Sequence, residues 1–216
     1  MKFIIGDIHD FDSLNEASRG VNIGIFAASM KQIEACERNP LQAIRTISIG
    51  AVNSKKVSIE NGFDAGVFVS TDKACSATTI YGACKYVGEQ AFLNEKGVKL
   101  NSCRYGNVAN STGSIIPVIQ NAIKYNLEIE LFSEEMTRFL ISPCEAIALI
   151  EKSLLEEGCG VYVPKLQSIR IKDLFEIYKK EFGLKFKVSK PRPNEKIHES
   201  MFSAEESSRV LSKKDY

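Results

Sequence analysis

Hydrophobic and polar positions in the first 126 residues follow two alternating patterns. Short apolar runs bounded by turn-forming residues are typical of buried strands. Longer segments with apolar residues every three or four positions predict helices that pack through one face. We predict strands at residues 2–5, 22–28, 65–70 and 98–104, helices at 10–18, 42–59, 80–94 and 115–125, and a loop at 106–114. Strands that alternate with helices predict an α/β fold with a doubly wound parallel sheet covered on both faces.

The pattern changes near residue 127, where the apolar runs become shorter. We predict strands at residues 128–132, 138–141 and 160–164, and helices at 144–155 and 171–182. The change predicts a first domain over residues 1–126 and a smaller lobe over residues 127–216.

Composition narrows the function classes. The chain has 28 basic and 27 acidic residues, so its net charge of +1 gives no general attraction to nucleic acid or acidic membranes. No apolar run approaches the roughly 20 residues of a membrane helix. Two histidines and six cysteines without a Cys-x-x-Cys pair disfavour a structural metal site. With no secretory signal at the start, we expect reduced thiols, a cytoplasmic location, and neither nucleic acid, membrane nor metal as a partner.

The residues most suggestive of chemistry follow the strand predicted at 65–70. Thr71, Asp72 and Lys73 come directly after it, and the next helix carries Tyr81 and Lys85 four positions apart, on one helix face. Ligands bind at the carboxyl ends of strands in such sheets. A nearby ammonium favours the phenolate of a tyrosine, which would let Tyr81 take a proton from an alcohol or sugar hydroxyl while a nicotinamide accepts hydride.

The Tyr-x-x-x-Lys spacing alone is weak evidence, because about one chance match is expected at average residue frequencies. The alternative interpretation is a half-buried helix face with a lysine reaching solvent. The preceding Thr-Asp-Lys at a strand end favours the catalytic interpretation.

These residues give the chain a resemblance to a known family. Val69–Ala74 (VSTDKA) followed by Tyr81–Lys85 (YGACK) resembles the UDP-N-acetylglucosamine 4,6-dehydratases of the inverting type. They are extended short-chain dehydrogenases/reductases of the polysaccharide-biosynthesis group. Further stretches match in the same order: FIIGDIHD (3–10), AASMKQ (27–32), RYGNV (104–108), GS (113–114), MTRF (136–139), VPK (163–165) and RPNEKIHE (192–199).

The resemblance implies a truncated Rossmann-like fold and a nucleotide-sugar dehydratase using NADP, with NAD as an alternative. Tyr81 would accept the proton of the carbon-4 hydroxyl, beside Thr71. Lys85 would lower the tyrosine pKa and hold the nicotinamide ribose. Lys73 would remove the hydrogen on carbon 5, and Asp72 would protonate the leaving carbon-6 hydroxyl. The implied cofactor-binding residues are Asp7, Ala27, Ala28, Lys31, Tyr81 and Lys85, and the implied substrate-binding residues are Arg104, Asn107, Arg138, Lys165, Arg192 and Glu195.

Several of these assignments have structural alternatives. Gly6-Asp7 is also an ordinary strand-end turn, Arg104 and Arg138 are equally suited to structural ion pairs, and Arg192 suits a solvated basic face. His198 is expected to be structural.

The sequence also departs from the family. It lacks the glycine-rich strand-turn-helix that receives the pyrophosphate of a dinucleotide. Phe26 replaces a common histidine, and Asn194 replaces a glycine. Four hypotheses therefore stay open: an active dehydratase completed by another chain or an upstream segment, a catalytically inactive remnant, a scaffolding subunit that pairs with a full-length homologue, and a nucleotide-sugar 4-epimerase. A homo-oligomer is also compatible with the sequence.

Overall fold

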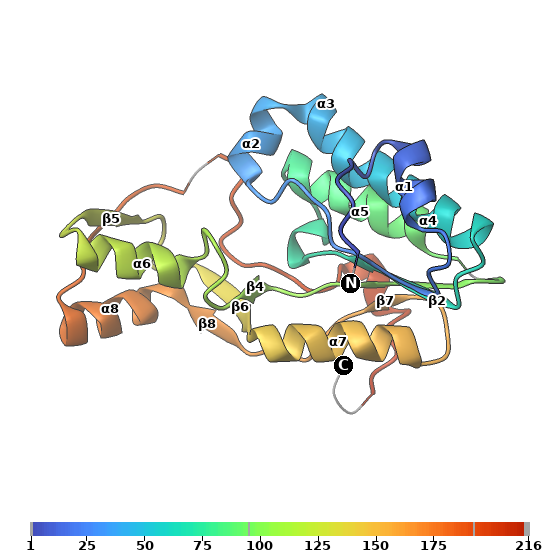
Figure 1. Ribbon diagram of the computed structural model, residues 1–216. Helices are drawn as coiled ribbons and strands as arrows, with labels where there is room; N and C mark the ends of the chain where they lie inside the picture. The colour runs from blue at the N-terminus through green and yellow to red at the C-terminus, as the bar shows by residue number, and fades with distance from the viewer. Residues whose placement is uncertain (1, 95, 192, 214–216) are drawn as a thin grey trace.

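A computed structural model describes residues 2–94, 96–191 and 193–213 of the chain. Its main sheet is parallel, with the strand order β1-β2-β3-β7. Helices cover both faces of this sheet: α4 and α5 pack on one side and α7 on the other (Figure 1). The predicted α/β fold is confirmed. The strands predicted at residues 22–28, 65–70 and 98–104 form this sheet together with the strand predicted at 160–164. The strands are β1 (Ile23–Phe26), β2 (Ala65–Val69), β3 (Lys99–Cys103) and β7 (Val161–Tyr162).

The helices of the main unit follow the predicted spacing with two differences. A short helix at residues 33–38 was not predicted, and the helix predicted at 42–59 includes a π-helical segment, Ile44–Ile49. The helices are α1 (Phe11–Ala17), α2 (Ile33–Arg38), α3 (Pro40–Ala43), α4 (Gly50–Glu60), α5 (Ile80–Phe92) and α7 (Pro143–Leu155).

Close packing holds α5 against β2. Val67 and Phe68 in β2 are fully buried, as expected for a central strand covered on both faces. A Cβ added at Gly88 of α5 would lie 2.9 Å from the Phe68 ring, so the absence of a side chain lets this helix approach the sheet. The beginning of α5 is thereby fixed near the carboxyl end of β2.

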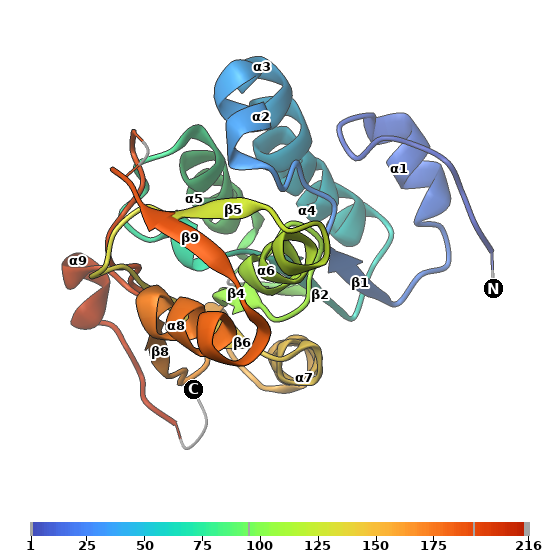
Figure 2. The same ribbon diagram turned by 90° about the vertical axis from the view of Figure 1, so that its left-hand side faces the viewer.

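The remaining elements form a smaller unit with its own core around Ile119, Leu131 and Phe175. It contains a sheet of order β4-β6-β8 and a parallel β5–β9 pair, which lie to one side of the main sheet (Figures 1 and 2). The elements are β4 (Asn107–Val108), α6 (Ile115–Lys124), β5 (Glu128–Leu131), β6 (Thr137–Ile141), β8 (Ser168–Arg170), α8 (Ile171–Phe182) and β9 (Lys185–Val188). The last helix, α9 (Ala204–Ser207), contacts Arg104 after β3 of the main sheet.

Two of the predictions about the fold need correction. The strand predicted at residues 2–5 is not formed: Ile5 is fully exposed, and the N-terminal stretch lies outside β1 with no ladder partner among the described residues (Figure 2). An apolar run forms a strand only where a neighbouring strand accepts its hydrogen bonds. The strand predicted at 160–164 pairs with β3, so α7 and β7 return to the main sheet and the packing layers do not separate at residue 126.

Candidate functional site

The turn after β2 places three polar residues at the carboxyl end of the sheet. Thr71 caps a 3₁₀ turn, Asp72–Ala74, and its hydroxyl accepts a hydrogen bond from the Lys73 backbone N–H. The backbone N–H of Asp72 donates to the Tyr105 carbonyl at 3.0 Å, which anchors the turn to the segment after β3. The turn therefore has a fixed position between the two central strands.

Asp72 and Lys73 form an ion pair in which one carboxylate oxygen is left without a donor. The Asp72 carboxylate is completely buried. Its Oδ1 accepts from the Thr71 hydroxyl at 2.9 Å and from Lys73 Nζ at 3.0 Å. No described residue donates to Oδ2. A buried carboxylate oxygen without a partner is costly in a folded protein, and it is typical of a site that binds a further group.

Tyr81 joins this turn from the first turn of α5. Thr79 caps the helix, its hydroxyl accepting from Gly82 N–H at 3.1 Å. A Cβ at Gly82 would lie 2.2 Å from the Lys73 carbonyl oxygen, so only glycine permits this contact between the helix and the turn. Burial and then the Asp72 charge raise the pKa of Tyr81 above its usual range, and a hydrogen bond with the Thr71 side chain opposes them. Thr71, Asp72, Lys73 and Tyr81 are thus brought together, as predicted.

Lys85 differs from its predicted arrangement. Its Nζ donates to the Val69 carbonyl at 2.6 Å and lies 4.6 Å from the centre of the Phe68 ring. Burial lowers the pKa of Lys85 to about 8, against the opposing effects of Cys103 and Glu89. The expected lowering of the Tyr81 pKa is not seen: the tyrosine pKa is raised, and the largest charge effect on it comes from Asp72. In this structure Lys85 is a buried amine of the sheet–helix interface.

The Lys85 amine predicts a pH-dependent stability. The unfolded pKa is 10.5 and the folded pKa about 8, so the unfolded chain binds more protons between these values. The penalty for burying the charge is fully present below pH 8 and disappears as the pH rises to 10.5. We expect Lys85→Met to raise the free energy of unfolding at pH 7 by about 2 kcal/mol, about 3 from the pKa difference less about 1 for the lost hydrogen bond.

Urea denaturation of both proteins at several pH values measures this difference. The advantage of Lys85→Met should shrink as the pH rises from 8. Lys55→Met, at a lysine that also donates to a backbone carbonyl, is the matched control. An advantage that stays constant up to pH 10 would contradict the assignment.

Two further side chains reach Lys73 from distant parts of the chain. Asn107 Oδ1 lies 3.4 Å from Lys73 Nζ, so this predicted substrate-binding residue is part of the cluster. Glu199 Oε1 lies 3.8 Å from the same nitrogen, and its side chain is 5% exposed. Glu199 was within the quoted RPNEKIHE motif but was not predicted as a site residue. The motif was the available signal, although nothing in it showed which of its charges would reach the turn.

Arg104 is a structural residue, which corrects its predicted role in substrate binding. Its guanidinium is 1% exposed and donates to both oxygens of Glu89, both oxygens of Glu206 and the Met201 carbonyl. Burial lowers the pKa of Arg104, and the hydrogen bonds with Glu89 and then Glu206 outweigh it, so the pKa is raised overall. All five N–H donors are used, so none is left for a phosphate.

Three of the other predicted substrate-binding residues, Arg138, Glu195 and Lys165, make contacts within the chain. Arg138 of β6 pairs with Glu195 at 3.1 Å and donates to the Ile197 carbonyl, which fastens the segment that carries Glu199. Lys165 donates to the Lys213 carbonyl. Arg192 lies outside the described residues. His198 bonds the Thr137 hydroxyl through Nδ1 at 2.9 Å, in the structural role expected of it.

The predicted cofactor residues outside α5 lie near β1 in sequence or in the N-terminal stretch. Ala27 and Ala28 follow the strand and are exposed, and Lys31 donates to Ser111 Oγ at 3.2 Å and to the Thr112 carbonyl. Asp7 is exposed and bonds the backbone and ring of His9. The described residues include no glycine-rich turn at a helix start for a pyrophosphate. The unpartnered Ser70 Oγ and Asp72 Oδ2 after β2, with Tyr81 near Asp72, fit the polar nicotinamide end of a dinucleotide.

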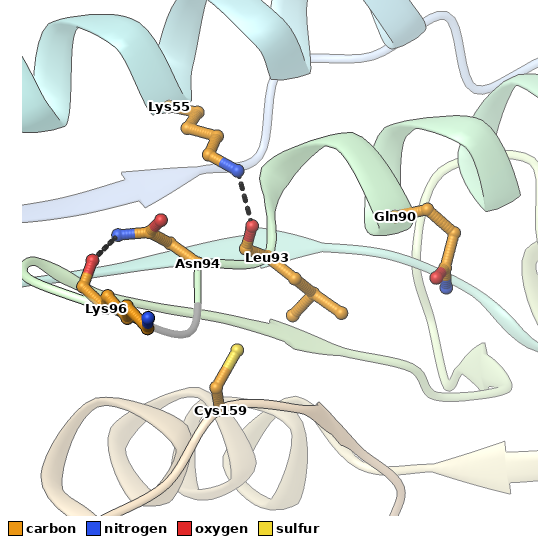
Figure 3. A pocket seen from close by; sticks show the side chains of 6 residues that line it. All are labelled: Lys55, Gln90, Leu93, Asn94, Lys96 and Cys159. Carbon is orange, nitrogen blue, oxygen red and sulfur yellow. Dashed lines mark hydrogen bonds between the residues drawn. The ribbon is translucent and has the colours of Figure 1, made fainter.

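The described residues contain no group of three metal-ligating side chains. None of their helices is long and apolar enough to cross a membrane. A pocket of about 500 Å³ lies away from the cluster, before β3, and is lined by Lys55, Gln90, Leu93, Asn94, Lys96 and Cys159 (Figure 3).

The sequence is similar to those of known enzymes, among them a dehydratase and an epimerase. The chain is 33% identical to a UDP-N-acetylglucosamine 4,6-dehydratase (inverting) of Campylobacter jejuni over 96% of this chain and 64% of that protein. It is 33% identical to a UDP-glucose 4-epimerase of Rickettsia canadensis over all of this chain and 66% of that protein. The chain therefore spans about two thirds of the length of these relatives.

Solved structures share the fold. The structure of Pen from Bacillus thuringiensis superimposes with a TM-score of 0.91 at 29% identity, over 99% of this chain and 69% of that one. DesIV, a dTDP-glucose 4,6-dehydratase from Streptomyces venezuelae solved with NAD bound, matches with a TM-score of 0.77 at 16% identity, over 94% of this chain and 71% of that one. The latter similarity concerns the fold alone. The model of the polysaccharide biosynthesis protein family matches residues 1–216, and the chain belongs to that family.

Proposed function

We propose that this chain carries the acid–base centre of a nucleotide-sugar dehydratase that converts UDP-N-acetylglucosamine to a 4-keto-6-deoxy sugar. The observation that carries the proposal is the Asp72–Lys73 pair, joined at 3.0 Å and set beside Tyr81, with Asp72 Oδ2 unpartnered. Removing water from a sugar needs a base for one carbon and an acid for the neighbouring hydroxyl, and this pair supplies both.

The residues divide the proton transfers between them. Tyr81, bonded to Thr71, accepts the proton of the carbon-4 hydroxyl as that carbon is oxidised. It does so as the phenolate, and because its pKa is raised in this structure, Lys85 has to approach the phenol to favour that form. The resulting carbonyl acidifies the hydrogen on carbon 5, which Lys73 removes as the neutral amine. Asp72 in its protonated form donates to the carbon-6 hydroxyl as it leaves. The ion pair therefore has to exchange one proton before elimination, and the direct 3.0 Å contact between Nζ and Oδ1 provides the path.

A nicotinamide dinucleotide supplies the hydride acceptor and donor for this chemistry when bound. NADP is the cofactor that the resemblance favours, and the NAD in DesIV keeps NAD as the alternative. Tyr81 and the exposed Ala27 and Ala28 would flank its nicotinamide end. Lys85 would have to leave the Val69 carbonyl to reach the ribose, and Lys31 and Asp7 stay as predicted contacts.

The substrate contacts follow from the same cluster. Asn107, next to Lys73, is placed to contact the sugar. We still predict that Arg138, Glu195 and Lys165 contact the nucleotide part of the substrate. Arg104 is no longer proposed as a substrate contact. We also keep the cytoplasmic location and a homo-oligomer or pairing with a full-length homologue as predictions. The exposed Ile23 and Ile25 of the edge strand β1 support the pairing, because an open apolar edge favours association.

A UDP-sugar 4-epimerase is the second candidate, supported by the Rickettsia canadensis relative. Epimerisation needs the tyrosine step alone and leaves the carbon-6 hydroxyl in place. The buried Asp72–Lys73 pair favours dehydration, because an epimerase has no use for an acid at carbon 6.

Incubating the purified chain with UDP-N-acetylglucosamine and NADP or NAD separates the candidates. We expect mass spectrometry to show a product that has lost one water and gained one deuterium at carbon 5 in heavy water. A product of unchanged mass with inverted carbon 4 would establish the epimerase. The absence of any product, together with absent dinucleotide binding in a titration, would favour the inactive or scaffolding hypothesis.

A further inference from the structure

Glu199 belongs to an alternating row of charges that starts at the catalytic turn. Asp72 Oδ1, Lys73 Nζ, Glu199 and Lys196 Nζ follow one another at 3.0, 3.8 and 3.6 Å. The side chains of Asp72 and Glu199 are 0% and 5% exposed, and those of Lys73 and Lys196 are 21% and 17% exposed. Lys73 therefore lies between two buried carboxylates, one adjacent in sequence and one 126 positions away.

The row is fixed at both ends. Lys196 donates to the Cys75 carbonyl at 2.6 Å, at the end of the 3₁₀ turn that carries Asp72 and Lys73. The Arg138–Glu195 pair and the bond from Arg138 to the Ile197 carbonyl hold the same segment to β6. Glu199 thus approaches Lys73 from a segment with its own supports, and its Oε2 has no hydrogen-bond donor among the described residues.

The contacts of Glu199 differ from those of a purely structural ion pair. A structural ion pair in a buried site gains most from short, bidentate contacts, as Arg104 makes with Glu89. Glu199 instead stands at 3.8 Å from Lys73 with one oxygen free of hydrogen bonds. At that distance its charge attracts the ammonium without competing with Asp72 for the short contact.

We propose that Glu199 is a positioning residue for Lys73, holding its side chain at the end of β2 and favouring its protonated form until a substrate enters. This role rests on the proposed dehydratase function, in which Lys73 acts as the base. A polar substrate that displaces the ammonium from Glu199 would leave Asp72 as its only carboxylate partner, which favours proton exchange within the pair. Glu199 itself touches Lys73 and not the reacting carbons.

Competitive acetylation of lysines in the intact chain tests the proposal without substrate. Only neutral amines react, so the rate at each lysine, read by mass spectrometry at one pH, reports its neutral fraction. We expect Glu199→Gln to raise the rate at Lys73 by on the order of tenfold, as for the loss of one opposite charge at this range. Rates at the buried Lys85 and the distant Lys55 should stay unchanged. Glu205→Gln, at an exposed glutamate of α9, is the matched control.

A second variant is expected to change the labelling rate at Lys73 in the opposite direction. Lys196→Met removes the ammonium that shares Glu199, so Glu199 then acts on Lys73 alone and the labelling rate at Lys73 should fall several-fold. A purely mechanical fastening predicts a rise instead, because the contact with the Cys75 carbonyl is lost. An unchanged Lys73 rate in Glu199→Gln, or a faster one in Lys196→Met, would overturn the proposal. If labelling at Lys85 also rises in Glu199→Gln, the substitution has loosened the fold. The direction of the change in Lys73 labelling in Lys196→Met then decides whether the proposal holds.

Turnover separates this proposal from the function on which it rests. With a UDP-sugar substrate, Glu199→Gln should lower kcat for elimination with little change in KM, and Glu199→Asp should restore part of it. Labelling that responds as expected in a chain that eliminates no water would retain the positioning role and reject the dehydratase. Labelling that does not respond in an active dehydratase would reject the positioning role alone.

Discussion

Replacing Lys73 by methionine is expected to reduce formation of the 4-keto-6-deoxy sugar by a factor of about 10²–10⁴, the usual contribution of a positioned acid or base. Lys73 Nζ lies 3.0 Å from Asp72 Oδ1, so its loss removes the base and also the proton that the aspartic acid must deliver. Tyr81 and Thr71 stay in place, and the oxidation of carbon 4 should survive. Deuterium on carbon 4 of the substrate should therefore still be transferred to the dinucleotide.

The matching variant Asp72→Asn keeps the volume of the side chain and should block the same step. Lys55→Met, at a lysine bonded to the Leu93 carbonyl, serves as the control and should leave turnover unchanged. Thermal melting of each variant shows whether it has folded. Full production of the 4-keto-6-deoxy sugar by a folded Lys73→Met protein would disprove the role of this residue.

The largest effect on stability is expected at Arg104. Replacement by methionine leaves Glu89, which is 0% exposed, without its partner, and it frees Glu206 of α9 as well. Breaking a buried ion pair by removing one member costs about 3–5 kcal/mol, a large part of the stability of a domain. Urea denaturation measures the loss, and limited proteolysis should show cleavage near residues 203–213.

Two comparisons make this prediction specific. Glu89→Gln introduced together with Arg104→Met should recover part of the loss, because it removes the unpaired charge. Arg170→Met, at an exposed arginine paired with Asp173, should barely change the stability.

The stability that the Arg104–Glu206 pair contributes depends on pH. Burial raises the pKa of Glu206, but the hydrogen bond and charge of Arg104 outweigh it and lower the pKa overall. The contribution of this pair is therefore present above about pH 4.5 and is lost as the pH falls below it. A small loss for Arg104→Met at pH 7 would contradict the assignment.

The sequence predicted local structure well where the pattern is local. The helix predicted at 171–182 is α8 with the same bounds, and β2 with the turn after it was located within a residue. The clustering of Thr71, Asp72, Lys73 and Tyr81 followed from their position at the end of a central strand. These features depend on residues close in sequence, whose spacing carries the information.

The remaining features depend on contacts between distant residues. An apolar run at residues 2–5 looks like a strand in one dimension, but a strand also needs an edge to pair with. Arginine suits a phosphate or two carboxylates equally, and the pattern gave no sign that Glu89 and Glu206 would meet Arg104. The direction of Lys85 likewise depends on the Val69 carbonyl and the Phe68 ring rather than on its spacing from Tyr81.

The return of β7 to the main sheet has a consequence for synthesis of the protein. A nascent chain that has left the ribosome as far as β3 still exposes the face of β2 and β3 that α7 covers, and it lacks the strand that pairs with β3. Glu206, the second carboxylate of the Arg104 network, emerges after β7. The chain up to β3 therefore stays incompletely folded, with apolar surface exposed, until the later elements have been synthesised. We expect this intermediate to bind chaperones during translation.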